Sequence, residues 1–398
     1  MATFKTISSA DIKTTKTVLN QLIDFVEEDV SGSASRKSYQ VFVTSSGGNA
    51  ITSSLFQTVF DQNFSLQTAN ELFDVTYGVF SGSASVSSAS TGIDTNGKIL
   101  FTSQSVMMRE KINIYRQFAQ TLLGNADNRF RAPFSSTSTS DNIDNALFLC
   151  FKRLFVRDGI KRETFAMRFF QSSSNPAPDF PVNFDNIYGQ TAAHPSSGSV
   201  IFTDVGAASS IERSQFGGDV GNIVLSSDTT QTVGLMFYQK GIAILDLERA
   251  LNKNQIMSGT ISSVGATSTT THSASFVPNF VNSASMDDII RHVATERFGT
   301  GSNTFLTFQN NTKINSTLIF CRATADEFNY SSNPTYTDSE GRILVIDESQ
   351  QGEEKSFSFV STVGLYDANE ELLATAKLSR PVEKNDEKDL TFRVRLDF

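Results

Sequence analysis

Apolar residues in this chain occur in short runs bounded by turn-forming residues, and Gly241 to Leu247 is a typical example. Such short runs indicate buried β-strands. The last hundred residues follow the same pattern almost throughout. Their strand-like runs are 304–308, 314–322, 342–346, 356–366, 371–378 and 390–396. The sequence therefore predicts an α+β fold, predominantly antiparallel β, with two helices in the N-terminal half, β-hairpins and a C-terminal β module.

Three segments carry the spacing of amphipathic helices. In 12–30, apolar residues recur at intervals of three, four and seven. A second helix is expected from a cap at Ser103 or Ser105 to a stop at Gly124. A third, shorter helix is expected over 285–298, where a serine precedes two aspartates.

Residues 146–168 combine strand-like runs with positive charge. Asp158-Gly159 lies between the apolar runs 147–151 and 164–170, which predicts a hairpin. Six basic and two acidic residues make this segment +4, in a chain whose net charge is -9. Its cations are either solvated hairpin positions or a tip that docks onto an acidic neighbour. The candidate interface residues are Lys152, Arg153, Arg157, Lys161 and Arg162.

Two further hairpins are expected. One joins 233–238 to 242–247. The other joins Thr362–Tyr366 to Leu372–Leu378 through the turn 367–370, and Ser379-Arg380-Pro381 should end its second strand. That hairpin is either internal or an edge that pairs with a neighbouring sheet.

Loops and regions complete the expected organisation. The segments 81–91 and 258–275 are Ser/Thr-rich, and 172–199 holds four of the eight prolines. We expect three regions: 1–145 with helices, 146–300 with hairpins and the Pro-rich excursion, and 301–398 as the β module.

Composition argues against several classes of function. Three histidines and two cysteines at unrelated positions supply no zinc-ligand spacing, and no nucleophile elbow or phosphate-binding loop occurs. The acidic pI of about 5.0 disfavours binding to nucleic acid or to an anionic membrane. No apolar run approaches a membrane-spanning length, and no signal peptide is evident. We therefore expect no enzyme activity, cofactor or metal, and synthesis in a reducing cytoplasm.

Phenylalanine is unusually frequent, with 34 copies against 8 tyrosines and no tryptophan. So many rings would make a very aromatic monomer core, so some are expected in contacts between subunits, where aromatic residues are enriched.

Several segments resemble one known family. They are Ile7–Thr15, Phe151–Phe155, Ile160–Met167, Glu327–Thr335, Ser361–Asp367, Glu371–Pro381 and Arg393–Phe398. Together they resemble virion structural proteins of T-even-like contractile-tailed phages, notably those that infect marine cyanobacteria.

The resemblance implies a non-enzymatic subunit of the virion tail, made in the host cytoplasm and placed in the baseplate or its wedges. The neck or head–tail connector is the alternative location. Its partners would be other tail subunits and copies of itself, without nucleic acid or membrane insertion. The candidate interface residues in the C-terminal block are Thr362, Val363, Leu365, Tyr366, Leu372, Lys377 and Phe398.

Two other classes stay open. A receptor-binding fibre protein should show repeats and a trimerising segment, and neither is visible in the sequence. A tail-associated hydrolase needs a carboxylate pair or a zinc site, and the sequence suggests none.

Overall fold

The structure is a computed structural model. It describes residues 4–26, 38–44, 50–61, 66–83, 106–170, 199–209, 212–251, 254–256, 273–275, 284–298, 304–331, 333–341, 343 and 357–397. The Pro-rich segment 172–199, except Ser199, and most of the two Ser/Thr-rich tracts lie outside these residues.

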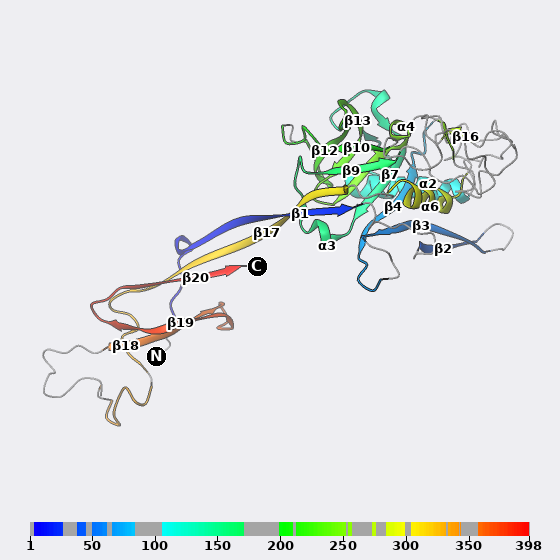
Figure 1. Cartoon of the computed structure of the whole chain (residues 1–398). Helices are drawn as coiled ribbons and strands as arrows, with labels where there is room; N and C mark the ends of the chain where they lie inside the picture. Colours follow the sequence, from blue (N-terminus) through cyan, green and yellow to red (C-terminus); the bar gives the residue numbers. More distant parts are fainter. Residues whose placement is uncertain are drawn as a thin grey trace. The chain divides into compact units, whose positions relative to one another are not determined.

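Contacts group the chain into two units, each described by itself (Figure 1). Unit 1 comprises Met1–Leu19 with Lys313–Phe398, and unit 2 comprises Asn20–Thr312. Unit 1 thus joins the two ends of the chain, which the three predicted consecutive regions keep apart.

Unit 2 is built on an antiparallel sheet, in the order β17-β9-β10-β12-β13-β14-β7-β4-β3-β2, with β8 beside β17 and β11 beside β12. The predominantly antiparallel β fold is therefore confirmed. The strands are β2 (Ser38–Thr44), β3 (Ala50–Phe60), β4 (Glu71–Val79), β7 (Asn145–Phe151), β8 (Gly159–Ile160), β9 (Ala166–Phe170), β10 (Ser199–Thr203), β11 (Glu212–Ser214), β12 (Gly218–Leu225), β13 (Asp228–Phe237), β14 (Ile242–Asp246) and β17 (Thr304–Ala323).

The remaining elements of unit 2 are short strands and helices. They are β5 (Phe130–Arg131), β6 (Asn142–Ile143), β15 (Asn254–Ile256), β16 (Ser273–Ser275), η2 (Thr139–Asp141), α2 (Val106–Leu123), α3 (Arg153–Val156), α4 (Leu247–Ala250) and α6 (Met286–Glu296).

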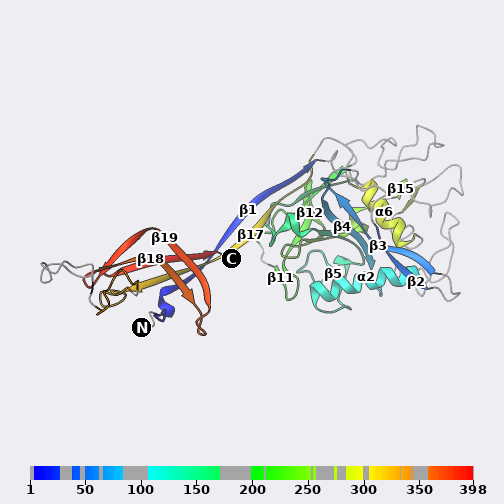
Figure 2. The ribbon, with the colours of Figure 1, turned by 90° about the horizontal axis from the view of Figure 1, so that it is seen from below.

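Two of the predicted helices, α2 and α6, are confirmed, and both contact the sheet at β4 (Figure 2). The Ser285 hydroxyl caps α6 by accepting a hydrogen bond from the backbone N–H of Asp288 at 3.1 Å. Gly124 ends α2 in the left-handed region with φ 81°. Local capping and spacing therefore determine these two elements.

Phenylalanine side chains form much of the core of unit 2. The rings of Phe118 and Phe148 stack with centroids 4.0 Å apart, joining α2 to β7. Phe73 contacts Phe151, Phe298 and Phe305 from three other parts of the unit. Many of the described phenylalanine rings therefore lie inside the chain's own core.

The predicted helix over 12–30 is wrong for its described part, because Ile12–Val26 forms the strand β1. Seven of these residues are β-branched: Ile12, Thr14, Thr15, Thr17, Val18, Ile23 and Val26. Branching at Cβ costs side-chain freedom in a helix and suits a pleated strand. Ser8 caps only the single 3₁₀ turn η1 (Ser9–Asp11), which precedes β1.

The predicted hairpin around Asp158-Gly159 is also wrong. β7 pairs with β14 and β4, whereas β9 pairs with β10 and β17. The intervening residues form α3 and the short strand β8, which pairs with β17. In contrast, the predicted hairpin of β13 and β14 is confirmed, with Gly241 at φ 62° in its turn.

Unit 1 is made almost entirely of strands. Its part of β17 lies beside β1 and pairs with β20 (Leu390–Asp397), while β18 (Phe357–Tyr366) and β19 (Leu372–Asn385) form a hairpin. The predicted end of the second hairpin strand at Pro381 is wrong, since β19 continues to Asn385. The register shifts between Val360 and Thr362, so Pro381 lies at a bulge, where its missing N–H breaks no ladder bond.

Candidate interaction surfaces

The basic segment leaves the sheet at the end of β7. The Lys152 N–H donates to the Leu72 carbonyl at 2.9 Å, and the single turn α3 follows. The chain returns to the sheet at β8, and the Asn310 side chain donates to the Phe155 carbonyl at 2.7 Å. One helical turn and its flanks are thus fixed to two strands.

The structure divides the five predicted cations of this segment into two groups. Lys152 forms ion pairs with Asp74 at 2.7 Å and Glu71 at 3.1 Å. Arg162 donates to the Ala207 carbonyl at 3.0 Å and is largely buried. These two cations are therefore engaged within unit 2.

The other three predicted cations, Arg153, Arg157 and Lys161, are exposed. The Arg153 side chain is 86% exposed and lies 3.5 Å from the Asp158 carboxylate. The Lys161 ammonium donates to the Gln309 side chain at 3.0 Å. The surface cations are therefore a subset of the predicted set.

Asp204 holds the polypeptide beside these cations. Its carboxylate accepts hydrogen bonds from the Tyr238 hydroxyl at 2.8 Å, the Glu163 N–H at 2.8 Å and the Phe165 N–H at 3.0 Å. Burial raises the pKa of Asp204, and these hydrogen bonds oppose the rise. Asp204 therefore positions the backbone that follows Arg162.

A hollow of about 370 Å³ lies at α3, and we call it the arginine hollow. Its lining residues are Arg153, Leu154, Arg157, Asp158 and Thr312. Leu154 lines the hollow and is 55% exposed. The hollow thus offers two guanidinium groups, one carboxylate and one apolar side chain.

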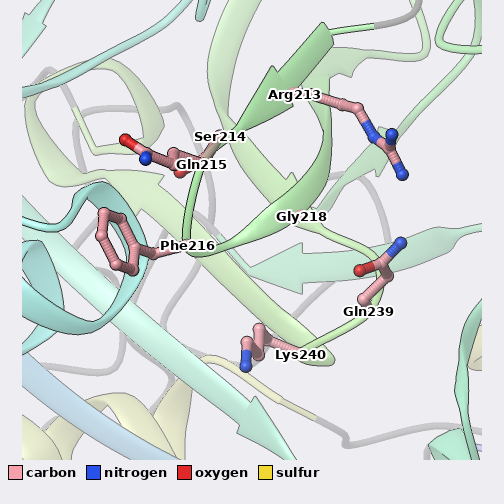
Figure 3. Close-up of a pocket in the computed structure, with 7 residues that line it drawn as sticks. All are labelled: Arg213, Ser214, Gln215, Phe216, Gly218, Gln239 and Lys240. Atoms are coloured by element: carbon pink, nitrogen blue, oxygen red, sulfur yellow. The ribbon is translucent and has the colours of Figure 1, made fainter.

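A second, wider depression of about 710 Å³ lies beside β11 and the β13–β14 turn. Figure 3 shows the side chains of Arg213 and Gln239 on one side of it and the ring of Phe216 on the other. Arg213 is already paired with Asp219 at 2.7 Å. One of its two cations is therefore neutralised, and Lys240 supplies the other.

Unit 1 has a thin apolar cluster. Its described buried members are Ile319, Leu365 and Val394, and partly buried side chains such as Ile7 surround them. Larger apolar side chains remain on the surface, including Phe359 at 60% and Leu373 at 68% exposure. Covering apolar surface of this kind with another molecule removes it from water and is therefore energetically favourable.

The N-terminal segment binds across unit 1. The Phe4 ring lies edge-on to Tyr366 with centroids 5.0 Å apart. Lys5 pairs with Glu327, and Asp11 pairs with Arg322 at 2.8 Å. The two ends of the chain are therefore held together in this unit.

The predicted interface residues of the hairpin occupy different environments. Thr362 and Lys377 are exposed and pair across the strands, and Leu372 is exposed. Leu365 is buried in the cluster, and Val363 packs against it. Tyr366 is partly covered by Phe4, and Phe398 lies outside the described residues.

Sequence reasoning missed three exposed residues of these surfaces and one buried cation of unit 1. Leu154 and Leu373 belong to apolar runs that indicate burial, yet both are exposed. Phe359 faces out because side chains alternate along β18. Lys384 is fully buried, and its ammonium donates to three oxygens, those of Asn329 (Oδ1) at 2.6 Å, the Asn385 carbonyl at 2.7 Å and the Ala325 carbonyl at 3.1 Å.

Comparison with known proteins finds no match to a family model, a curated protein or a solved structure. Among the described residues, no group of three or more His, Cys, Asp or Glu side chains is arranged to hold a metal ion. No helix in the described part of the chain is long and apolar enough to cross a membrane.

Proposed function

We propose that this protein is a structural subunit of a contractile phage tail, placed in the baseplate or its wedges, and that it works by binding neighbouring subunits. The observation that carries the proposal is the composition of unit 1. Among the described residues of unit 1, the apolar cluster has few buried members, while Phe359, Leu372 and Leu373 are exposed to water. A strand-rich unit with this distribution gains stability when a partner covers it.

The positions of the resembling segments support the same proposal. Ile7–Thr15 and the C-terminal segments, from Glu327 onward, all belong to unit 1. There Ile7 packs against the apolar cluster, and Asp11 pairs with Arg322. Segments distant in sequence therefore contribute to one surface-forming unit.

The central resembling segments lie at the arginine hollow. Phe151–Phe155 contains Arg153 and Leu154, which line it. Ile160–Met167 contains Lys161 and Arg162 and begins in β8, beside β17. The resemblance therefore covers two surfaces with exposed apolar or cationic side chains, that of unit 1 and the arginine hollow.

Electron microscopy of phage particles tests this proposal. An antibody raised against the purified chain, detected with gold, should label the distal end of the tail. Label at the collar would contradict the baseplate location and favour the neck. Particles that remain unlabelled, while the antibody detects the chain in the infected lysate, would contradict a virion role.

A further inference from the structure

The arginine hollow is exposed and rigidly built. The Arg157 N–H donates to the Arg153 carbonyl at 2.9 Å, and the Asp158 N–H donates to the Asn311 carbonyl at 3.0 Å. These bonds hold the backbone between α3 and β17. The fold therefore fixes the backbone positions from which the side chains of Arg153 and Arg157 extend.

Arg157 has an unfavourable backbone conformation, with φ 59° and ψ -115°. A residue with a Cβ rarely adopts a positive φ, and such backbone strain costs on the order of 1–3 kcal/mol. Such residues persist only where the surrounding structure maintains them, and they are concentrated at functional sites. Here the residue in this conformation is an exposed arginine beside Arg153.

The charge of the hollow is incompletely neutralised. Asp158 lies 3.5 Å from Arg153. Within the part of the chain that the structure describes, no ion pair engages the Arg157 guanidinium. A partner with carboxylates can therefore bind both arginines in the bidentate geometry that guanidinium groups favour.

The turn between β18 and β19 has the complementary chemistry. We call residues 367–373 the hairpin tip. The Asp367 carboxylate accepts from the N–H groups of Asn369 at 2.9 Å and Glu371 at 2.8 Å, which fixes the turn. Glu370 adopts φ 64° in this turn. The tip is thus shaped by its own hydrogen bonds.

The tip exposes two carboxylates next to two leucines. Glu370 and Glu371 are exposed, and no ion pair engages them among the described residues. Leu372 and Leu373 follow directly and are 56% and 68% exposed. The tip therefore presents adjacent acidic and apolar groups, and the hollow presents adjacent basic and apolar groups.

We propose that the hairpin tip of one copy binds in the arginine hollow of a second copy. Glu370 and Glu371 pair with Arg153 and Arg157, and the tip leucines cover Leu154. The proposal rests on the proposed function, because it assumes a subunit present in several neighbouring copies. A free inorganic anion would match the arginines but leave Leu154 uncovered, so a peptide fits the hollow better.

Tip and hollow are different surfaces, and every copy offers one of each. Binding can therefore close reciprocally between two copies, with each tip in the other copy's hollow, or continue from copy to copy into a larger ring or an open row. In every case association needs one intact tip and one intact hollow, so variants of the two surfaces, alone and mixed, distinguish the proposed contact from other pairings.

Sedimentation velocity of the full chain tests the proposal. The wild-type chain should self-associate, to dimers or to larger assemblies, as concentration rises, and less at high salt because ion pairs are screened. The hollow variant Arg153→Gln/Arg157→Gln and the tip variant Glu370→Gln/Glu371→Gln should each raise the dissociation constant on the order of tenfold or more, through loss of two charge pairs. Each variant alone should be monomeric where the wild type associates.

Mixing the two variants gives the sharpest result. The intact tip of the hollow variant should enter the intact hollow of the tip variant, and no further copy can add. We therefore expect heterodimers in a 1:1 ratio and nothing larger. A mixture that stays monomeric, or variants that associate like the wild type, would overturn the proposal.

Two control variants change the same charges elsewhere. Arg213→Gln/Lys240→Gln neutralises the second depression, and Asp386→Asn/Asp389→Asn neutralises the exposed β19–β20 turn. Both should associate like the wild type. A wild-type chain that remains monomeric at its solubility limit would also overturn the proposal, including the case in which the tip occupies the hollow of its own chain. Gold-labelled tails with a monomeric chain would then leave the proposed function standing.

Discussion

At the scale of single residues, burial changes the chemistry of one carboxyl in unit 2. Asp246 ends β14 and caps α4, where its side chain accepts from the Glu248 N–H at 3.0 Å. Burial, with a smaller contribution from the Glu248 charge, raises the pKa of Asp246 from 3.8 to about 7. The Arg249 guanidinium, 3.2 Å away, opposes this rise.

This pKa predicts how stability depends on pH. A carboxyl whose pKa is higher in the folded state binds protons more tightly there, so its stabilising contribution is complete at low pH and is lost as pH rises from about 4 to about 7. Asp246→Asn removes the titration but keeps a capping side chain. As pH rises over this range, we expect the free energy of unfolding of the variant to increase relative to that of the wild type by up to about 4 kcal/mol. The slope corresponds to roughly 1.4 kcal/mol for each pH unit.

Urea unfolding between pH 4 and pH 7 measures this difference. Asp204 also has a raised pKa, and it titrates in both proteins, so its contribution cancels in the comparison. The charge of Asp144 adds to the raised pKa of Asp246, so its effect on Asp246 belongs to the difference that is measured. Curves of unfolding free energy against pH that run parallel for the two proteins would contradict the prediction.

Single residues also show where sequence reasoning stops. Arg153, Arg157 and Lys161 were predicted as surface cations and are exposed. Lys152 and Arg162 have the same chemistry, but their engagement depends on Asp74 and Ala207, which are distant in sequence. The positive φ of Arg157 and the three hydrogen-bond acceptors of Lys384 could not be predicted, because no pattern of neighbouring residues indicates them.

At the scale of elements, α2 and α6 could be predicted because capping, spacing and the Gly124 stop are local signals. β1 could not, because most of it is exposed and its few inward side chains give no clear period of two. The strand order also depends on partners far apart in sequence. Asp158-Gly159 is a strong hairpin signal, but the flanking strands each find a better partner elsewhere in the sheet.

The contact of α2 with the sheet gives a prediction at this scale. A Cβ added at Gly78 of β4 would lie 2.7 Å from the backbone nitrogen of Tyr115 and 2.9 Å from its Cα. Backbone atoms cannot move aside without shifting the helix. We therefore expect Gly78→Ala to lower the free energy of unfolding by about 1–3 kcal/mol, as overpacking does.

Gly82→Ala is the matched control for this prediction. Its added Cβ would meet the Phe80 ring at 3.0 Å, and a side chain can turn away. Thermal or urea unfolding of the two variants should separate them clearly. Equal stabilities for both would show that α2 does not pack as closely on β4 as the structure indicates.

At the scale of the whole molecule, the two units differ in how their apolar residues are used. Unit 2 buries an extended cluster rich in phenylalanine, whereas the cluster of unit 1 centres on Ile319, Leu365 and Val394. The frequency of phenylalanine predicted that some of the rings would serve subunit contacts. The structure places most of the described phenylalanines in the core of unit 2 and leaves Phe359 and the tip leucines exposed in unit 1.

This difference predicts that the stability of unit 1 depends on protein concentration. A partner that binds only the folded state stabilises it by mass action, and exchange slows about tenfold when the partner is present at ten times its dissociation constant. Hydrogen exchange measured by mass spectrometry should therefore show β18, β19 and β20 becoming more protected as concentration rises.

The hollow variant Arg153→Gln/Arg157→Gln tests whether tip binding, rather than another contact between copies, stabilises unit 1. Its substitutions lie in unit 2, so they leave the folded structure of unit 1 unchanged, but they remove the surface that binds the hairpin tip. If tip binding stabilises unit 1, the concentration dependence of exchange in β18 and β19 disappears in this variant. If protection still rises with concentration, copies meet through another surface of unit 1, such as the one around Phe359.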